Sequence, residues 1–94
     1  MGLGMEEAET IALKALAWLA GHPDLGPMFL AAGGLAPSDL AARAGDADLL
    51  VAVLDFLLME DAWVRAFCDE AALPYDRPLL ARMALPGGAQ VHWT

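Results

Sequence analysis

The sequence has few of the side chains from which catalytic sites are built. Its 94 residues include one cysteine and no asparagine, and its hydroxyl and amide side chains are limited to Thr10, Ser38, Tyr75, Gln90 and Thr94. Ser38 has no histidine near it in the sequence to act as its base. Cys68 is followed by Asp69 and Glu70, and negative neighbours raise the pKa of a thiol. We therefore predict no catalytic residue, no cofactor site and no enzymatic activity.

The sequence has only two histidines, and they do not form a metal-binding pattern. His22 precedes Pro23 at the junction between two predicted helices, where a capping or surface role is expected. His92 lies in the last part of the sequence, so a site built from both histidines and Asp24 would require this part to fold back onto the junction. Their spacing matches no known set of zinc ligands, and we predict no bound metal.

Long apolar runs are absent as well. The longest uncharged apolar run, Leu49–Leu54, is far shorter than the roughly 18 residues that a membrane-spanning helix needs. Residues 1–6 lack the basic and apolar regions of a signal peptide, and a single cysteine cannot form an internal disulfide. We therefore expect a cytoplasmic bacterial protein with no membrane segment.

Positive charge is scarce too. Five basic residues oppose 13 acidic ones, which gives a formal net charge of −8. The acidic residues are spread over most of the chain, and such a surface repels the phosphates of nucleic acids. Nucleic-acid binding is therefore not expected, and a basic protein partner is electrostatically easier.

Alanine and leucine are abundant, with 20 and 17 residues respectively. Both favour helices, so the composition predicts an all-α protein. The stretch Asp48–Met59 is the most apolar part of the chain, and in a helix Asp48, Ala52 and Asp55 would share one narrow stripe. We expect this helix, at about residues 47–60, to be surrounded by the others as the centre of the core.

Local start and stop signals divide the chain into about five to six helices that pack as a compact bundle. Glycines end the first three helices, and Pro37 takes the first position of the third. No glycine or proline separates the central helix from the next one, which leaves the count open. We predict one domain, residues 1–88, and a C-terminal tail, residues 89–94. The expected helices cover approximately residues 5–20, 24–32, 37–44, 47–60, 61–72 and 76–83.

The two halves of the sequence resemble each other at an offset of 38 residues. The matching pairs include Leu16 and Leu54, Leu19 and Leu57, Phe29 and Phe67, and Leu35 and Leu73. One interpretation is a duplicated unit of one long and two short helices, in which the first helix packs against the central one. The other interpretation is that any helical sequence rich in leucine and alanine aligns with itself by chance.

The aromatic residues supply a candidate interface. Trp63 is expected to anchor the core with Phe67, and an exposed interface position is the alternative. Trp93 follows the helix-breaking Pro86–Gly88, so it either folds back onto an apolar groove or inserts into a partner. Aromatic side chains are frequent hot spots of interfaces. The candidate interface residues are Tyr75, Val91, His92 and Trp93.

Several runs of the sequence carry a resemblance to a known family: Ala15–Leu19, Phe29–Leu30 with Gly33–Leu35, Pro37–Leu40 with Arg43–Ala44, and Ala52–Leu58. They resemble a family of small helical proteobacterial proteins that is described only as a domain of unknown function. The resemblance extends over about residues 8–84. It implies a small, stand-alone intracellular helical protein, and it assigns no catalytic or binding residue.

The negative charge, the apolar excess and the scarcity of catalytic groups favour a non-enzymatic protein–protein interaction or regulatory module. Its partner would be another protein, or a second copy in a homodimer. One alternative is a small-molecule or acyl-chain binder with an apolar cavity between the central helix and the helices at 5–20 and 61–72. A weaker alternative is a DNA-binding regulator of the helix-turn-helix type, with Leu40–Arg43 or Leu79–Arg82 on the recognition helix.

Overall fold

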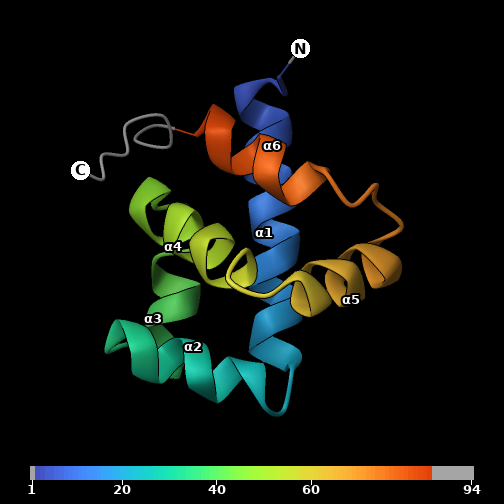
Figure 1. Ribbon diagram of the computed structural model, residues 1–94. Coiled ribbons are helices and arrows are strands. Elements are labelled where there is room, and N and C mark those ends of the chain that lie inside the picture. Colours follow the sequence, from blue (N-terminus) through green and yellow to red (C-terminus); the bar gives the residue numbers. More distant parts are fainter. Residues whose placement is uncertain (1, 86–94) are drawn as a thin grey trace, which may run out of the picture.

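Residues 2–85, which the computed structural model describes, form six helices and no strand (Figure 1). The all-α prediction is therefore confirmed, and within this range no helix is long and apolar enough to pass through a membrane. Each helix begins within one residue of its predicted position and ends within three. The predicted domain end at residue 88 and the tail at 89–94 lie outside the described residues. In chain order the helices are α1 (Met5–Gly21), α2 (Leu25–Gly33), α3 (Pro37–Ala42), α4 (Ala47–Leu57), α5 (Asp61–Ala71) and α6 (Arg77–Ala84).

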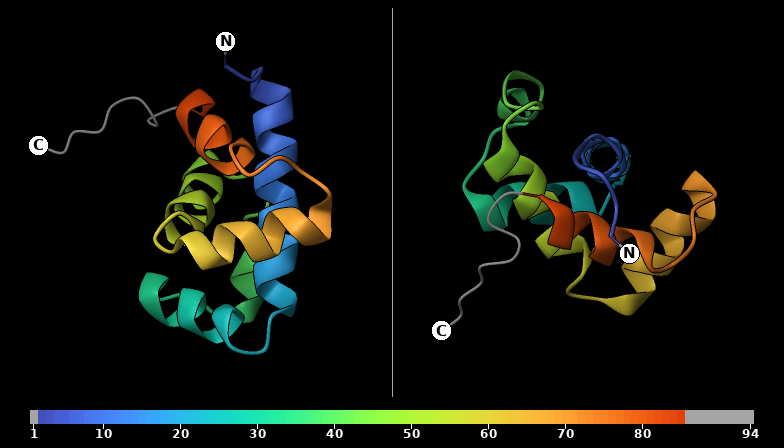
Figure 2. Two further views of the ribbon diagram at one scale, coloured as in Figure 1. Left: turned by 45° about the vertical axis from the view of Figure 1, so that its right-hand side comes forward. Right: turned by 90° about the horizontal axis from the view of Figure 1, so that it is seen from above.

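Every other helix packs against α1, which is the longest of the six. In the right-hand view of Figure 2, α1 is seen end-on, and part of its circumference is left uncovered by the other helices. Its buried face combines small and large side chains: Ala8, Ile11, Ala12, Ala15, Leu16 and Leu19. Small side chains let helices approach closely, and the most extensive contacts of α1 are those with α6 and α4.

The burial of α4 follows the pattern of its sequence. Only Asp48, Ala52 and Asp55 are exposed in this helix. However, α4 packs mainly against α1 and α6, whereas all five other helices pack against α1, so α1 shares the central position expected for α4. The helix also ends three residues earlier than predicted, because the chain turns at residues 58–59 and the backbone of Glu60 is extended. This turn separates α4 from α5 and gives the count of six helices.

Aromatic rings join α4 to its neighbours. Phe56 meets Phe29 edge-on, with 5.4 Å between ring centroids, and stacks on Trp63 at 5.0 Å. Trp63 is half-buried and packs against the core, as predicted. Phe67 is buried in the core and contacts Trp18 edge-on at 5.9 Å. These contacts connect α4 with α2 and α5, and α1 with α5.

Asp46 begins α4 as a helix cap. Its Oδ1 atom accepts a hydrogen bond from the backbone N–H of Asp48 at 2.9 Å, and the first N–H groups of a helix need such a partner. This bond, helped by the Arg43 guanidinium 3.3 Å away, holds the pKa of Asp46 below its usual value. The carboxylate is therefore charged at neutral pH, where it also favours the positive end of the helix dipole.

Two helix ends repeat the offset of 38 residues found in the sequence. Gly34 and Ala72, which follow α2 and α5, both adopt left-handed backbone angles, with φ of 65° and 58°. The next residues, Leu35 and Leu73, each donate their N–H to a carbonyl five positions earlier at 2.9 Å. The caps agree with a duplicated unit, but α6 packs extensively on α1 whereas its counterpart α3 makes little contact with α4. Duplication therefore stays a hypothesis.

Replacing Gly26 by alanine tests the close approach of α2 to α1. A Cβ atom at Gly26 would lie 2.7 Å from the backbone carbonyl oxygen of Leu19, so one of the two helices would have to move. We expect Gly26→Ala to lower the free energy of unfolding by about 1–3 kcal/mol in urea titrations. Gly21→Ala is the control, because its Cβ would meet nothing within 4 Å and alanine is the better helix former. Equal stability of the two variants would contradict this packing.

Replacing Ala72 by glycine should stabilise the protein, because the left-handed conformation is strained for alanine and not for glycine. We expect the free energy of unfolding to rise by up to about 1 kcal/mol, since the flexibility of glycine in the unfolded chain offsets part of the relief. Ala71→Gly, at the last residue of α5, should instead lower it by roughly 0.5–1 kcal/mol. The stability of both variants is compared with that of the parent protein by thermal unfolding. A loss of stability in Ala72→Gly equal to that in Ala71→Gly would rule out the left-handed cap.

Candidate binding groove

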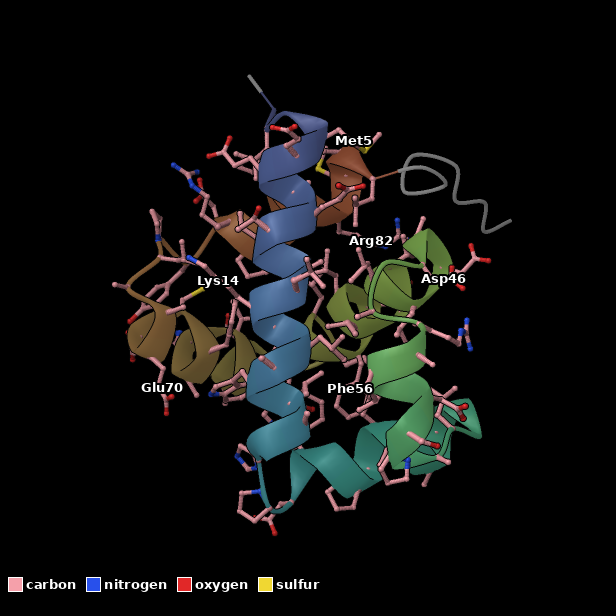
Figure 3. The ribbon with its side chains drawn as sticks, turned by 180° about the vertical axis from the view of Figure 1, so that it is seen from behind. Met5, Lys14, Asp46, Phe56, Glu70 and Arg82 are labelled. Carbon is pink, nitrogen blue, oxygen red and sulfur yellow. The ribbon has the colours of Figure 1, made fainter. Side chains whose placement is uncertain are left out.

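An apolar groove of about 580 Å³ opens between α1, α2 and α3. Figure 3, which is seen from behind, shows α1 in front with α3 beside it and α2 below both. Among the described residues, those that line the groove are all apolar or glycine: Leu13, Leu16, Ala17, Leu19, Ala20, Gly26, Pro27, Phe29, Leu30, Pro37, Leu40, Ala41 and Ala44. The groove therefore offers apolar contact and no side-chain hydrogen bond.

The groove has a buried floor and an exposed rim. The buried floor residues are Leu16, Leu19, Gly26, Phe29 and Leu40. Gly26 determines the depth of this floor, because only a residue without a side chain allows α2 to lie so close to the backbone of α1. On the rim, Leu13 is 41% exposed. Together with the exposed Ala17, Pro27, Pro37 and Ala41 it forms a continuous apolar surface, and such patches mark binding sites.

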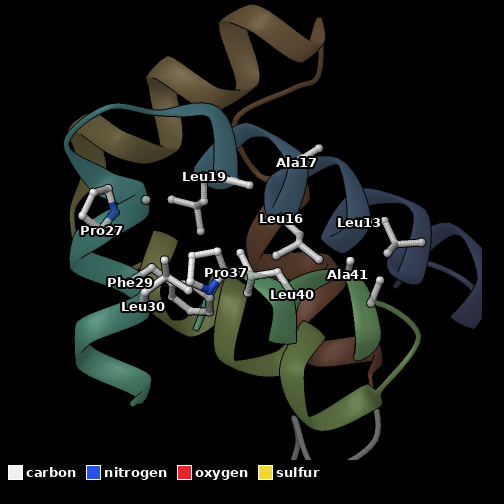
Figure 4. Close-up of a pocket in the computed structure, with 13 residues that line it drawn as sticks. Leu13, Leu16, Ala17, Leu19, Pro27, Phe29, Leu30, Pro37, Leu40 and Ala41 are labelled. Carbon is white, nitrogen blue, oxygen red and sulfur yellow. The ribbon is translucent and has the colours of Figure 1, made fainter. Parts of the chain in front are cut away.

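Small residues at helical spacing form the two walls. Each wall follows the pattern i, i+4, i+7: Leu13, Ala17 and Ala20 on α1, and Pro37, Ala41 and Ala44 on α3 and just after it. On α1 this spacing places the three side chains on one helix face, and on α3 it does so for Pro37 and Ala41, while Ala44 lies in the turn that follows the helix. Figure 4 shows Leu13 and Leu16 of α1 on one side of the groove, and Leu40 and Ala41 of α3 on the other. The alanines keep the groove open, because larger side chains at these positions would fill it.

The alternative drawn from the sequence is an apolar cavity between α4, α1 and α5, and the apolar groove described above lies elsewhere. Val53, Leu54 and Leu57 of α4 are fully buried there and pack into the core. A cleft of about 390 Å³ does lie between α1 and α5, but Lys14 and Glu70 border it and no residue of α4 lines it. The apolar groove forms where α2 and α3 meet α1.

The pattern of the sequence does not single out the groove residues. Its one available signal is Leu13, a large apolar residue that does not belong to the buried face of α1. Alanines give no signal, because Ala17 in the groove and Ala12 in the core favour a helix equally.

His22 has the capping role expected from its position. Its Nδ1 atom accepts hydrogen bonds from the backbone N–H groups of Asp24 and Leu25, both at 3.1 Å, at the start of α2. The ring also contacts Trp18 edge-on, with 5.2 Å between centroids. Within residues 2–85, no group of three or more His, Cys, Asp or Glu side chains is arranged to hold a metal ion. His92 lies outside this range.

Tyr75 is an exposed residue of the loop between α5 and α6, away from the groove. Its hydroxyl donates a hydrogen bond to Oδ1 of Asp69 at 2.7 Å, and the Arg65 guanidinium lies 5.8 Å from the ring centroid. The hydrogen bond to Asp69 and the negative charge of that carboxylate raise the pKa of Tyr75 above its ordinary value. The other candidate interface residues, at 91–93, lie outside the described part of the chain.

Cys68 is a small core residue, as its sequence position suggests. Its side chain is fully buried, and Sγ donates a weak hydrogen bond to the carbonyl oxygen of Pro74 at 3.5 Å. Burial raises the pKa of the Cys68 thiol, and the charges of Asp69 and Asp76 raise it further. The thiol is therefore protonated at neutral pH and is a poor nucleophile.

The arginines of both predicted recognition helices are paired with carboxylates. Within residues 2–85 the ion pairs are Arg43–Asp46, Arg65–Asp61, Arg77–Asp76 and Arg82–Asp55. Lys14 is the one basic residue in this range that has no such partner. Little free positive charge therefore remains for a phosphate backbone.

A protein family model covers almost the whole of this sequence. The family model described as "Protein of unknown function (DUF3572)" matches residues 5–88, a range that contains all six helices. No curated protein and no solved structure matches the chain.

The hydrogen bond of Tyr75 can be tested by titration, because the chain contains one tyrosine and its absorbance reports on that residue alone. Ionisation removes the proton that Tyr75 donates and places a phenolate beside the Asp69 carboxylate. We therefore expect a titration midpoint above the ordinary value of about 10, and a fall towards that value in Asp69→Ala. Asp48→Ala, on α4, should leave the midpoint unchanged, with circular dichroism as the check on folding. The same midpoint in Asp69→Ala as in the parent protein would refute the hydrogen bond.

Proposed function

The chain belongs to this DUF3572 family of unknown function, and from its groove we propose that it is a non-enzymatic protein-binding module. In this proposal, the apolar face of an amphipathic helix from another protein lies between α1 and α3. One observation supports it above all: the residues that line the groove of about 580 Å³ are apolar or glycine throughout. Docking of an amphipathic helix into an apolar groove is a recurring mode of protein recognition.

The walls of the groove favour a helix as the occupant. Ala17 and Ala41 lie on opposite walls, and small side chains allow the backbone of another helix to approach. The spacing of each wall also matches the ridges by which helices pack together. Leu13 and Pro27 are exposed at the rim and would be covered by a docked helix. Removing such apolar surface from water contributes roughly 25 cal/mol per Å².

An acyl chain is the second candidate. The volume lies within the range of roughly 300–1,000 Å³ found for small-molecule sites, but such sites also carry a few polar groups that orient the ligand. No polar side chain of the described residues lines this groove, so a fatty-acid carboxylate would have no partner there. Lys14, the unpaired base, borders the cleft between α1 and α5 instead. The lining therefore supports an apolar helix face over an acyl chain.

A model peptide tests the proposal. The probe is a fluorescent amphipathic helix of about five turns, with leucine on one face and equal numbers of lysine and glutamate on the other. We expect it to bind with a Kd in the roughly micromolar range, measured by fluorescence anisotropy. Ala17→Gln and Ala41→Gln place longer polar side chains in the walls and should each raise the Kd at least about tenfold, which is about 1.4 kcal/mol. Ala52→Gln, on the exposed face of α4, is the matched control and should leave the Kd unchanged.

Failure of the probe to bind, or an equal effect of Ala52→Gln, would overturn the proposal. Sedimentation of the protein alone addresses a second copy as the partner. A dimer that dissociates in Ala41→Gln would identify the chain as its own partner at the groove.

A further inference from the structure

Two glutamates extend the α1 wall of the apolar groove beyond its end. On α1, Glu9 precedes Leu13 by four residues and Glu6 precedes Glu9 by three, so both continue the α1 wall beyond the end of the groove. Both glutamates are exposed. Asp24 stands immediately before α2, and Asp39 lies in the first turn of α3. Asp39 accepts a hydrogen bond from the backbone N–H of Ala36 at 2.8 Å, so its carboxylate caps α3, and the negative charge that continues a groove wall is that of Glu6 and Glu9.

Of the nearest bases, Arg43 is paired, and Lys14 borders the cleft on the α5 side of the wall residue Ala17. Arg43, which follows α3, pairs with Asp46 at 3.3 Å. Lys14 borders the cleft between α1 and α5. Within residues 2–85, no ion pair involves Glu6, Glu9, Asp24 or Asp39. The groove is thus apolar along its length, with two unpaired glutamates beyond the end of its α1 wall.

We propose that the groove selects a basic amphipathic helix, in which lysine or arginine borders the apolar face. This inference rests on the proposed function, because it specifies the partner of the same groove. The apolar residues bind the helix by burial, and the carboxylates of Glu6 and Glu9, which continue the α1 wall, attract its positive side chains. Unpaired charges act over roughly 8 Å at physiological ionic strength, and the net charge of −8 adds a general attraction.

Charge and apolar contact act on different steps of binding. Charges at the rim of an interface mainly change the rate of association, whereas buried contacts determine how long a complex lasts. A helix bordered by lysine should therefore associate faster than one bordered by glutamate, although both carry the same leucine face. The difference should shrink as salt is added, because the attraction is screened.

Three peptides with one common leucine face test the inference on the full chain. Their polar faces consist of lysine, of glutamate, or of equal numbers of both. Stopped-flow anisotropy measures association at roughly 0.05 M and 0.5 M salt. At low salt we expect the lysine peptide to associate at least about tenfold faster than the glutamate peptide, and the rates to converge at high salt.

The outcomes separate this inference from the proposed function. Equal association rates of the lysine and glutamate peptides at low salt would overturn the charge selection, while binding of the mixed peptide would still support the groove as a helix site. If none of the three peptides binds, the proposed function fails and the selection fails with it.

Two double variants with the same net charge show where the attraction comes from. Glu6→Gln with Glu9→Gln removes two carboxylates beside the groove, and Glu60→Gln with Glu70→Gln removes two exposed ones at α5. We expect the first pair to slow association of the lysine peptide about threefold or more, and the second pair to have little effect. Equal slowing by both pairs would assign the attraction to the overall charge and overturn the role of the groove carboxylates.

Discussion

The packing of α4 and α6 against the alanine face of α1 is the contact on which the rest of this structure depends. Ala8, Ala12 and Ala15 are fully buried on that face, so neighbouring helices can lie close to the backbone of α1. Since α1 begins the helical part of the described chain and α6 ends it, the same contact joins the two ends of the bundle. A larger side chain at any of these three positions would force the helices apart.

Charged side chains lie at the surface and at helix ends of the described residues, outside the apolar core. Within residues 2–85 no polar or charged side chain belongs to the buried core. Polar groups act at helix ends, as Asp46 and His22 do, or at the surface. Asp55 and Arg82 form the one ion pair of this range that links distant parts of the chain, 27 positions apart. That pair connects α4 with α6, the two helices that cover the alanine face of α1.

The groove follows from the same arrangement. The contacts of α1 with α4 and α6 are extensive, whereas α3 touches α1 through few residues and α4 hardly at all. A helix docked between α1 and α3 would give α3 apolar contacts that the chain itself does not supply. In the proposed complex, binding would stabilise the folded state by mass action and would thereby favour the ordered form of α3. In the proposal, Glu6 and Glu9 would add charge selection without placing a polar group inside the groove.

The positions of the helices depend on signals that act within about one helical turn. Pro37, the Asp46 cap and the left-handed Gly34 operate at that range, and for this reason the helix bounds could be predicted to within three residues. The groove could not be predicted in this way. Ala12 and Ala17 are the same residue type on one helix, yet Ala12 is fully buried and Ala17 lines the groove. The sequence by itself determined the helices and their caps, because these signals are local. Only the tertiary structure decided which face of α1 was covered, because that depends on contacts between segments far apart in the chain.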